Sequence, residues 1–198
     1  MNRKCSILTV IVVLALTAGM AHAATFSITV VDKATGGPLS KALVVVMSGE
    51  SVSKTAKTSN QGTWSDTVPA GANRWVVSKT PYFCESAAIS FDAQGNASVR
   101  VEMRRHSSDD YKRLGRIVGF VRAAGGQPIP NATLVLLKGN APVGATQPEN
   151  PAGVYELQWF PPGSYTVLAT APGFKSAKYA GQSIAAGESV MLDITLQK

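Results

Sequence analysis

One stretch of this sequence occurs twice in altered form. Gly36 to Val46 reads GGPLSKALVVV, and Gly125 to Leu136 reads GGQPIPNATLVL. From Pro38 onward the two stretches align at an offset of 90 residues. In each, a turn rich in glycine and proline leads into a run of apolar residues, which is typical of a strand that begins after a tight turn.

The repeat extends well beyond this stretch, with the same order and nearly the same spacing. A repeating unit of about 80 residues has the size of a domain rather than of a solenoid repeat. The sequence therefore predicts two tandem domains, at residues 24–104 and 115–198. The further matching pairs are Gln61 to Trp64 with Ala152 to Tyr155, Val68 to Gly71 with Phe160 to Gly163, and Thr80 to Phe83 with Ala171 to Phe174.

Each copy consists of short apolar alternations separated by Gly, Pro and Asn turns, with almost no helical periodicity. Seven short strands per copy predict an antiparallel Greek-key β-sandwich, and the chain is expected to be all-β. We expect strands at residues 25–31, 42–48, 54–57, 63–68, 74–79, 86–91 and 97–104 of the first copy, and at 116–122, 132–137, 143–145, 154–160, 164–169, 175–184 and 189–196 of the second.

The second copy resembles the carboxypeptidase regulatory-like domain, a seven-stranded transthyretin-like (prealbumin-like) sandwich allied to the carbohydrate-binding-like fold. The first copy resembles it less well and is interpreted as a diverged relative. In this family the domain usually accompanies a catalytic or transport module, so the resemblance implies a scaffold rather than an active site. The resemblance rests on Ile117 to Val121, Gly126 to Ala132, Gly153 to Tyr155, Phe160 to Val167 and Ala171 to Phe174.

Residues 1–23 have the pattern of a secretory signal peptide. Arg3 and Lys4 precede an apolar run from Ile7 to Ala18, and Ala21-His22-Ala23 provides a small-residue cleavage site. An uncleaved signal anchor is the alternative interpretation. Cleavage predicts an exported protein, periplasmic or extracellular, with no stable membrane insertion afterwards. Cys84 is then the only cysteine left, and a buried thiol is favoured over a reactive or intermolecular one.

The charge and the scarcity of reactive residues exclude several functions. Without Arg3 and Lys4, 17 basic and 12 acidic residues remain, a net charge of +5 that is spread evenly along the chain. This argues against nucleic acid as a partner. His106 is the only histidine outside the leader. The mature chain thus lacks a zinc-ligand set, so we expect no metal, no cofactor and no catalytic residues.

Residues 105–114 have the composition of a linker between the domains. Either the linker lets the domains move independently, or it forms one helical turn, capped by Ser108 with Asp109 and Asp110 at its N-terminus, that fixes the angle between them. Each domain is long enough to bury its own core, so residues 24–105 and 113–198 are each expected to fold alone.

Two tryptophans are candidate ligand-binding residues. Strand alternation assigns no core position to Trp159. Its ring could stack on a sugar or on a partner's proline, or it could cover its own core. Trp75 lies in an alternating strand and is ambiguous. A cross-link between Lys33 and Asn96 beside Asp66, as in surface adhesins of related fold, is conceivable, but an exposed lysine and a turn asparagine are favoured.

These observations favour a non-enzymatic structural or protein-binding module of the cell envelope, with an envelope protein or polysaccharide as partner. Carbohydrate binding through exposed aromatic side chains is the alternative. A hydrolase of transthyretin-like fold is a remote third possibility, because the chain lacks the histidines and the C-terminal motif of that enzyme.

Overall fold

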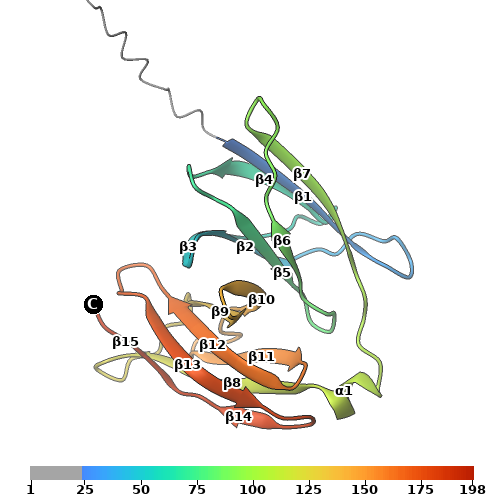
Figure 1. The fold of residues 1–198 in the computed structure, drawn as a ribbon. Coiled ribbons are helices and arrows are strands. Elements are labelled where there is room, and N and C mark those ends of the chain that lie inside the picture. The colour runs from blue at the N-terminus through green and yellow to red at the C-terminus, as the bar shows by residue number, and fades with distance from the viewer. Residues whose placement is uncertain (1–23) are drawn as a thin grey trace, which may run out of the picture.

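The computed structural model describes residues 24–198, which form two β-sandwiches stacked one above the other (Figure 1). The predicted leader at residues 1–23 lies outside the described residues. The first sandwich consists of β1 (Ala24–Asp32), β2 (Leu43–Ser48), β3 (Ser51–Lys57), β4 (Thr63–Val68), β5 (Arg74–Ser78), β6 (Glu85–Ala88) and β7 (Asn96–Met103).

A short helix, α1 (Asp110–Arg113), leads into the second sandwich. Each predicted strand corresponds to an observed one with bounds that differ by three residues at most, except that the last predicted strand is divided in two. The second sandwich consists of β8 (Gly115–Ala123), β9 (Thr133–Lys138), β10 (Ala141–Thr146), β11 (Val154–Phe160), β12 (Gly163–Thr170), β13 (Ala177–Ile184), β14 (Ser189–Met191) and β15 (Ile194–Leu196).

The two sandwiches share one topology. In the first, the sheet β4-β1-β7 covers the sheet β3-β2-β5-β6. In the second, the sheet β11-β8-β14, with β15 also paired to β8, covers the sheet β10-β9-β12-β13. Strand for strand, the order is the same in both copies.

The sheets are not purely antiparallel, which corrects the expectation. β1 pairs in parallel with β7, and β8 pairs in parallel with β14 and β15. In each copy the last strand arrives from the opposite sheet, so no hairpin fixes its direction relative to the first strand.

The division between β14 and β15 has a local cause. The Leu192 amide donates a hydrogen bond to the Val118 carbonyl at 2.8 Å, and the Asp193 carboxylate accepts one from the Phe120 amide at 3.1 Å. A side-chain oxygen therefore takes the place of a backbone carbonyl and interrupts the ladder at this point.

A repeated set of hydrogen bonds underlies the repeated sequence. The Val30 amide donates to the Gly62 carbonyl and the Val121 amide to the Gly153 carbonyl, each at 2.8 Å. Gly62 and Gly153 have φ of 71° and 76°, a left-handed conformation that favours glycine. A Cβ on either glycine would collide with the carbonyl oxygen of the same valine partner. Both copies therefore need a glycine at this position, because the backbone is left-handed and lies close to the valine carbonyl.

Each sandwich has its own core between its two sheets. The first core includes Phe26, Ile28, Val44, Val46 and Val77. The second is built from the equivalent strands and contains Ile117, Leu134, Leu136, Tyr155 and Tyr165, among others.

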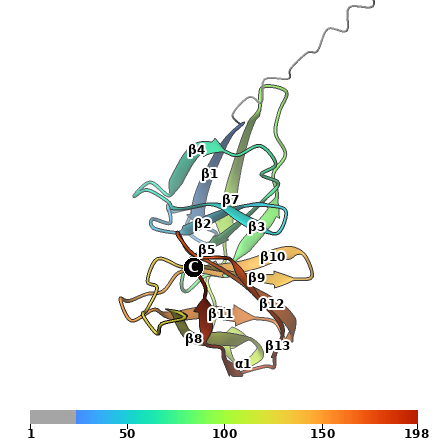
Figure 2. The same cartoon turned by 90° about the vertical axis from the view of Figure 1, so that its left-hand side faces the viewer.

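A third apolar cluster joins the sandwiches, and we call it the interdomain cluster. The inner sheets face one another, with β9 and β10 against β2 and β5 (Figures 1 and 2). Because β2 and β9 contact their own core with one face and the other sandwich with the opposite face, their side chains are buried without alternation. The interdomain cluster comprises Leu43, Val45, Met47, Val76, Val135, Leu137, Ala145 and Leu168.

Candidate functional site at the junction of the two sandwiches

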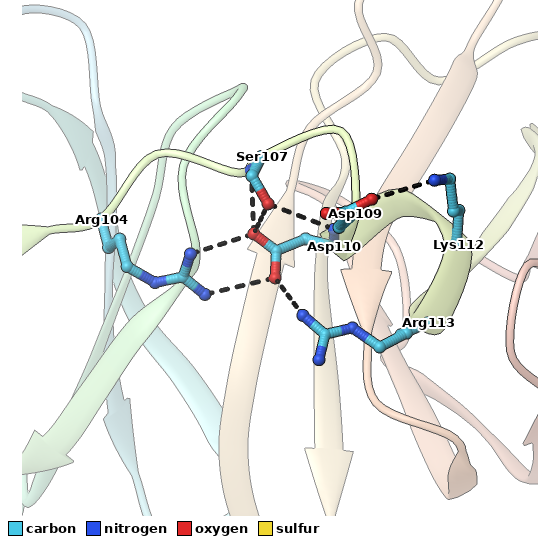
Figure 3. Close-up of polar contacts among 6 residues, drawn as sticks. All are labelled: Arg104, Ser107, Asp109, Asp110, Lys112 and Arg113. Carbon is cyan, nitrogen blue, oxygen red and sulfur yellow. Dashed lines mark hydrogen bonds and ion pairs between the residues drawn. The ribbon is translucent and has the colours of Figure 1, made fainter.

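The linker contains the single helical turn that was one of the two expected forms. The predicted cap at Ser108 is not formed: the N-cap residue is Asp109, which makes no side-chain capping hydrogen bond, and Ser107 bonds to the first turn instead. The Asp110 amide donates to the Ser107 hydroxyl at 3.3 Å, and the Asp110 carboxylate accepts the Ser107 amide at 2.8 Å, a reciprocal cap (Figure 3). Asp109 forms an ion pair with Lys112 at 2.9 Å. The turn is thus fixed at both ends.

The Asp110 carboxylate anchors this turn to the first sandwich. It is 6% exposed and accepts a hydrogen bond from the Arg104 guanidinium at 2.9 Å and another from Arg113 at 3.4 Å (Figure 3). The Arg104 guanidinium and the Ser107 donors hold the pKa of the Asp110 carboxyl well below its usual range. Asp110 therefore stays ionised at any physiological pH and remains paired.

A series of ring contacts continues from the first sandwich to the second. Phe83 packs edge-on against His106 with ring centroids 4.1 Å apart, His106 against Tyr111 at 5.7 Å, and Tyr111 against Trp159 at 4.6 Å. The Arg104 guanidinium lies 3.9 Å above the Phe83 ring. We call the set Phe83, His106, Tyr111 and Trp159 the aromatic series.

Trp159 is therefore neither a free surface ring nor part of the second core. Its indole is partly covered by Tyr111, and the Arg116 guanidinium lies 5.4 Å from its ring centroid. The residue has φ of 62°, and the β11–β8 register shifts between Leu157 and Phe160. This bulge turns the indole toward the linker, which alternation along the strand could not indicate.

Trp75, the second candidate from the sequence, lies far from the linker turn. It is 6% exposed and packs in the core of the first sandwich. An indole with so little exposed surface has no face to stack on a sugar ring. The structure does not bring the two tryptophans into one site, and of the two candidates only Trp159 is partly exposed.

His106 is buried without a hydrogen-bond partner for either ring nitrogen. Its imidazole is thus neither oriented by a carboxylate nor in contact with a hydroxyl, as general-base catalysis would require. Burial, with a smaller effect of the Arg104 charge, lowers the pKa of His106, while the Asp110 charge acts in the opposite direction. The histidine serves as a ring in the aromatic series.

We expect this burial to make stability depend on pH. The unfolded chain binds a proton at His106 near pH 6.5, whereas the folded chain resists protonation until a lower pH. Stability is therefore full above about pH 6.5 and decreases as the pH falls below that value. Urea unfolding of the protein and of His106→Phe between pH 7 and pH 5 measures this, and the decrease should be smaller in the variant. Equal slopes would contradict it.

Polar contacts join the sandwiches directly. The Ala145 amide donates to the Ser78 hydroxyl at 2.9 Å, and that hydroxyl is hydrogen-bonded to the Cys84 thiol at 3.1 Å. Thr80 donates to Gln158 at 3.2 Å, and Lys178 pairs with Glu50 across the junction. The Ser78 bond covers the outer edge of β10, which would otherwise offer an unpaired backbone donor.

Cys84 packs against the second core although it belongs to the first sandwich. Burial raises the pKa of its thiol, so the thiolate form is disfavoured. The residue as a whole is half-buried, and its side chain packs against the core of the other sandwich.

The three residues of the conceivable cross-link do not lie together. Lys33 and Asn96 lie at opposite ends of the β1–β7 pair, since β7 begins at Asn96 beside Thr25 and ends at Met103 beside Asp32. Asp66 is exposed and pairs with Lys54 at 2.6 Å. A buried lysine beside an asparagine and a carboxylate is therefore not formed by these residues.

A groove of about 300 Å³ opens beside the interdomain cluster. One wall belongs to the first sandwich and carries Lys41, Lys57 and Lys79, while Glu149 and Glu156 come from the second. The sequence analysis did not single out these lysines, because they are far apart along the chain and belong to no motif. Among residues 24–198, no three His, Cys, Asp or Glu side chains lie close enough together to hold a metal ion.

Comparison with known protein families gives a match for the second sandwich. Residues 116–197 match the model of the carboxypeptidase regulatory-like domain. This confirms the resemblance seen in the sequence for that half of the chain. The family model does not extend over the first sandwich. No curated protein matches the sequence.

Solved structures similar to the chain include pilins and another bacterial protein. The Bacillus anthracis TIE protein is 19% identical with a TM-score of 0.35, and the match covers 88% of this chain and 34% of that one. The minor pilin GBS52 of Streptococcus agalactiae is 12% identical (TM-score 0.36; 88% and 96% covered). The shaft pilin SpaA of Lactobacillus rhamnosus GG is also 12% identical (TM-score 0.31; 88% and 97% covered). This chain spans about a third of the length of the TIE protein.

Proposed function

We propose that this protein is a non-enzymatic structural module of the cell envelope, in which two sandwiches act as one rigid body that holds a protein partner or spaces its neighbours. The interdomain cluster is the observation that carries the proposal. A domain that only needed to be tethered would keep a polar outer face, whereas here both inner sheets bury apolar side chains against each other.

The contacts of the linker also support a rigid arrangement of the two sandwiches. The Arg104–Asp110 ion pair, the capped turn and the aromatic series connect the linker to both sandwiches. The linker therefore restrains the angle between the sandwiches. A carboxypeptidase regulatory-like domain typically accompanies another module, and we infer that the first sandwich, with its matching topology and hydrogen bonds, is a diverged copy of the second.

Export is part of the proposal and rests on the leader pattern at residues 1–23. Among residues 24–198 there is no helix with the length and apolar character needed to cross a bilayer. Fusion of residues 1–23 to a reporter that is active only outside the cytoplasm tests this. We expect an active reporter and cleavage directly after Ala23. Reporter activity without cleavage would favour the signal anchor, and no activity would contradict export.

Rigidity is tested by residual dipolar couplings of the mature chain in weakly aligning medium. If the sandwiches form one body, a single alignment tensor fits the amides of both. Ser65→Ala, an exposed substitution on β4 outside the interdomain cluster, should also give a single tensor, because it leaves the junction intact. Two different tensors would show that the sandwiches move independently, and the proposed spacer role would then be wrong.

A further inference from the structure

We infer that the groove beside the interdomain cluster is a binding site for a carboxylate-bearing polysaccharide, held by Lys41, Lys57 and Lys79. This site goes beyond the structural role proposed above, and it rests on the fixed junction of that proposal because both sandwiches line the groove. The inference starts from the register of the inner sheet of the first sandwich.

The sheet register brings the three lysines to one place. In the β2–β3 ladder, Lys57 is paired with Leu43, and in the β2–β5 ladder, Ser78 is paired with the same Leu43. Lys79 follows Ser78 directly, and Lys41 lies two residues before Leu43. Residues from three separate segments thus gather at one end of the sheet. The three lysines form no ion pair with a carboxylate among the described residues.

The second sandwich provides an internal comparison. In its inner sheet, Thr133 is the counterpart of Leu43 and pairs with Thr170, the counterpart of Ser78. The positions equivalent to the three lysines are then Asn131, Gln147 and Ala171, and all three line a second groove of about 380 Å³. The equivalent positions therefore carry three lysines in one copy and none in the other. The lysine that lines the second groove, Lys54, comes from the first sandwich and is paired with Asp66. A fold requirement would apply to both copies, so the lysines serve something else.

The backbone at Lys41 is a second, independent observation. Lys41 has φ of 55°, one of two non-glycine residues with positive φ among residues 24–198. The buried Thr58 holds this turn: its carbonyl accepts the Lys41 amide at 3.0 Å, and its hydroxyl donates to the Leu39 carbonyl at 2.7 Å. Strained residues that the surroundings hold firmly are concentrated at binding sites. Asn131, at the equivalent turn, does not share the positive φ.

The remaining lining indicates the class of ligand. Hydroxyl and amide groups of Ser78, Thr80, Thr146, Gln147 and Gln158 surround the lysines, as sugar hydroxyls would require. The apolar part of the lining comes from Leu43, Tyr82, Ala145 and Pro148. The glutamates oppose an anion only weakly, because Glu156 is paired with Arg116 at 2.5 Å and Glu149 is exposed. A polymer with carboxylates and hydroxyls fits this lining better than an acidic peptide.

The test is titration of the mature chain with polygalacturonate at low ionic strength, with dextran and poly-L-glutamate as comparison polymers. The test variant is the triple Lys41→Asn, Lys57→Gln, Lys79→Ala, which installs the residues that the second sandwich carries at equivalent positions. The matched control is Lys33→Asn, Lys138→Gln, Lys175→Ala, which removes the same charge from exposed sites elsewhere.

We expect the test variant to bind polygalacturonate about tenfold more weakly, the sum of three partly exposed charge contacts, and the control to change affinity by about twofold or less. Amide shifts on binding should be concentrated at residues 41–43 and 145–147. An equal loss in both variants, the absence of binding, or tighter binding of poly-L-glutamate would each overturn the inference. The titration does not measure rigidity, so its outcome can be told apart from that of the alignment-tensor test.

Discussion

Leu168→Asp is expected to separate the two sandwiches while leaving each one folded. Leu168 is 2% exposed and lies in the interdomain cluster. A carboxylate buried there without a partner costs several kcal/mol, and separation of the sandwiches returns it to water. The expected result is two alignment tensors in place of one, and two unfolding transitions reported by Trp64 and Trp75 in the first sandwich and Trp159 in the second.

Val167→Asp is the matched control for this variant. Val167 is the preceding residue of β12, but its side chain lies in the second core. We expect this substitution to unfold the second sandwich itself, because separation gives its carboxylate no route to water. If both variants unfold the second sandwich alike, that sandwich depends on the junction for its stability. If Leu168→Asp leaves a single tensor, the interdomain cluster does not hold the sandwiches together.

The second large effect is expected for Tyr165→Ala, which should destabilise the protein by about 3–5 kcal/mol. Tyr165 is 3% exposed, its ring packs against Phe160 with centroids 6.2 Å apart, and its hydroxyl donates to the Pro161 carbonyl at 2.6 Å. Truncation leaves a cavity in the second core and an unpaired carbonyl. Denaturant unfolding followed by circular dichroism measures the change.

Trp159 provides the contrast to Tyr165. We expect Trp159→Ala to cost only about 1 kcal/mol, because the indole packs on one ring of the linker and is partly exposed. Trp159→Gly should be more stable than Trp159→Ala by about 1 kcal/mol, since glycine adopts the φ of 62° at little cost. A loss for Trp159→Ala as large as that for Tyr165→Ala would place the indole in the core.

Expression of each half of the chain on its own tests whether the sandwiches fold independently. Residues 24–105 and 113–198 each contain a complete core, so the prediction that each folds alone still stands. Each fragment would, however, expose its half of the interdomain cluster to water. Association or poor solubility of the fragments would follow from that exposed surface.

Much of the fold could be predicted from the sequence because its signals are local. Alternating apolar residues, the Gly62 and Gly153 turns and the repeated proline motifs act through neighbouring backbone, so they indicate the strands and the all-β class correctly. The double-sided burial of β2 and β9 was not predicted, because the face that meets the other sandwich depends on how the two sandwiches pack.

The parts that the sequence could not determine depend on residues far apart in the chain. Parallel pairing of β1 with β7, the burial of Trp75 and the turn of Trp159 toward Tyr111 follow from how the sheets pack and where a bulge falls. The lysine groove exists only because two ladders align Lys57 and Ser78 on Leu43. Local periodicity determined the strands of this protein, while the face that meets the other sandwich, and the site formed beside it, were decided by long-range packing alone.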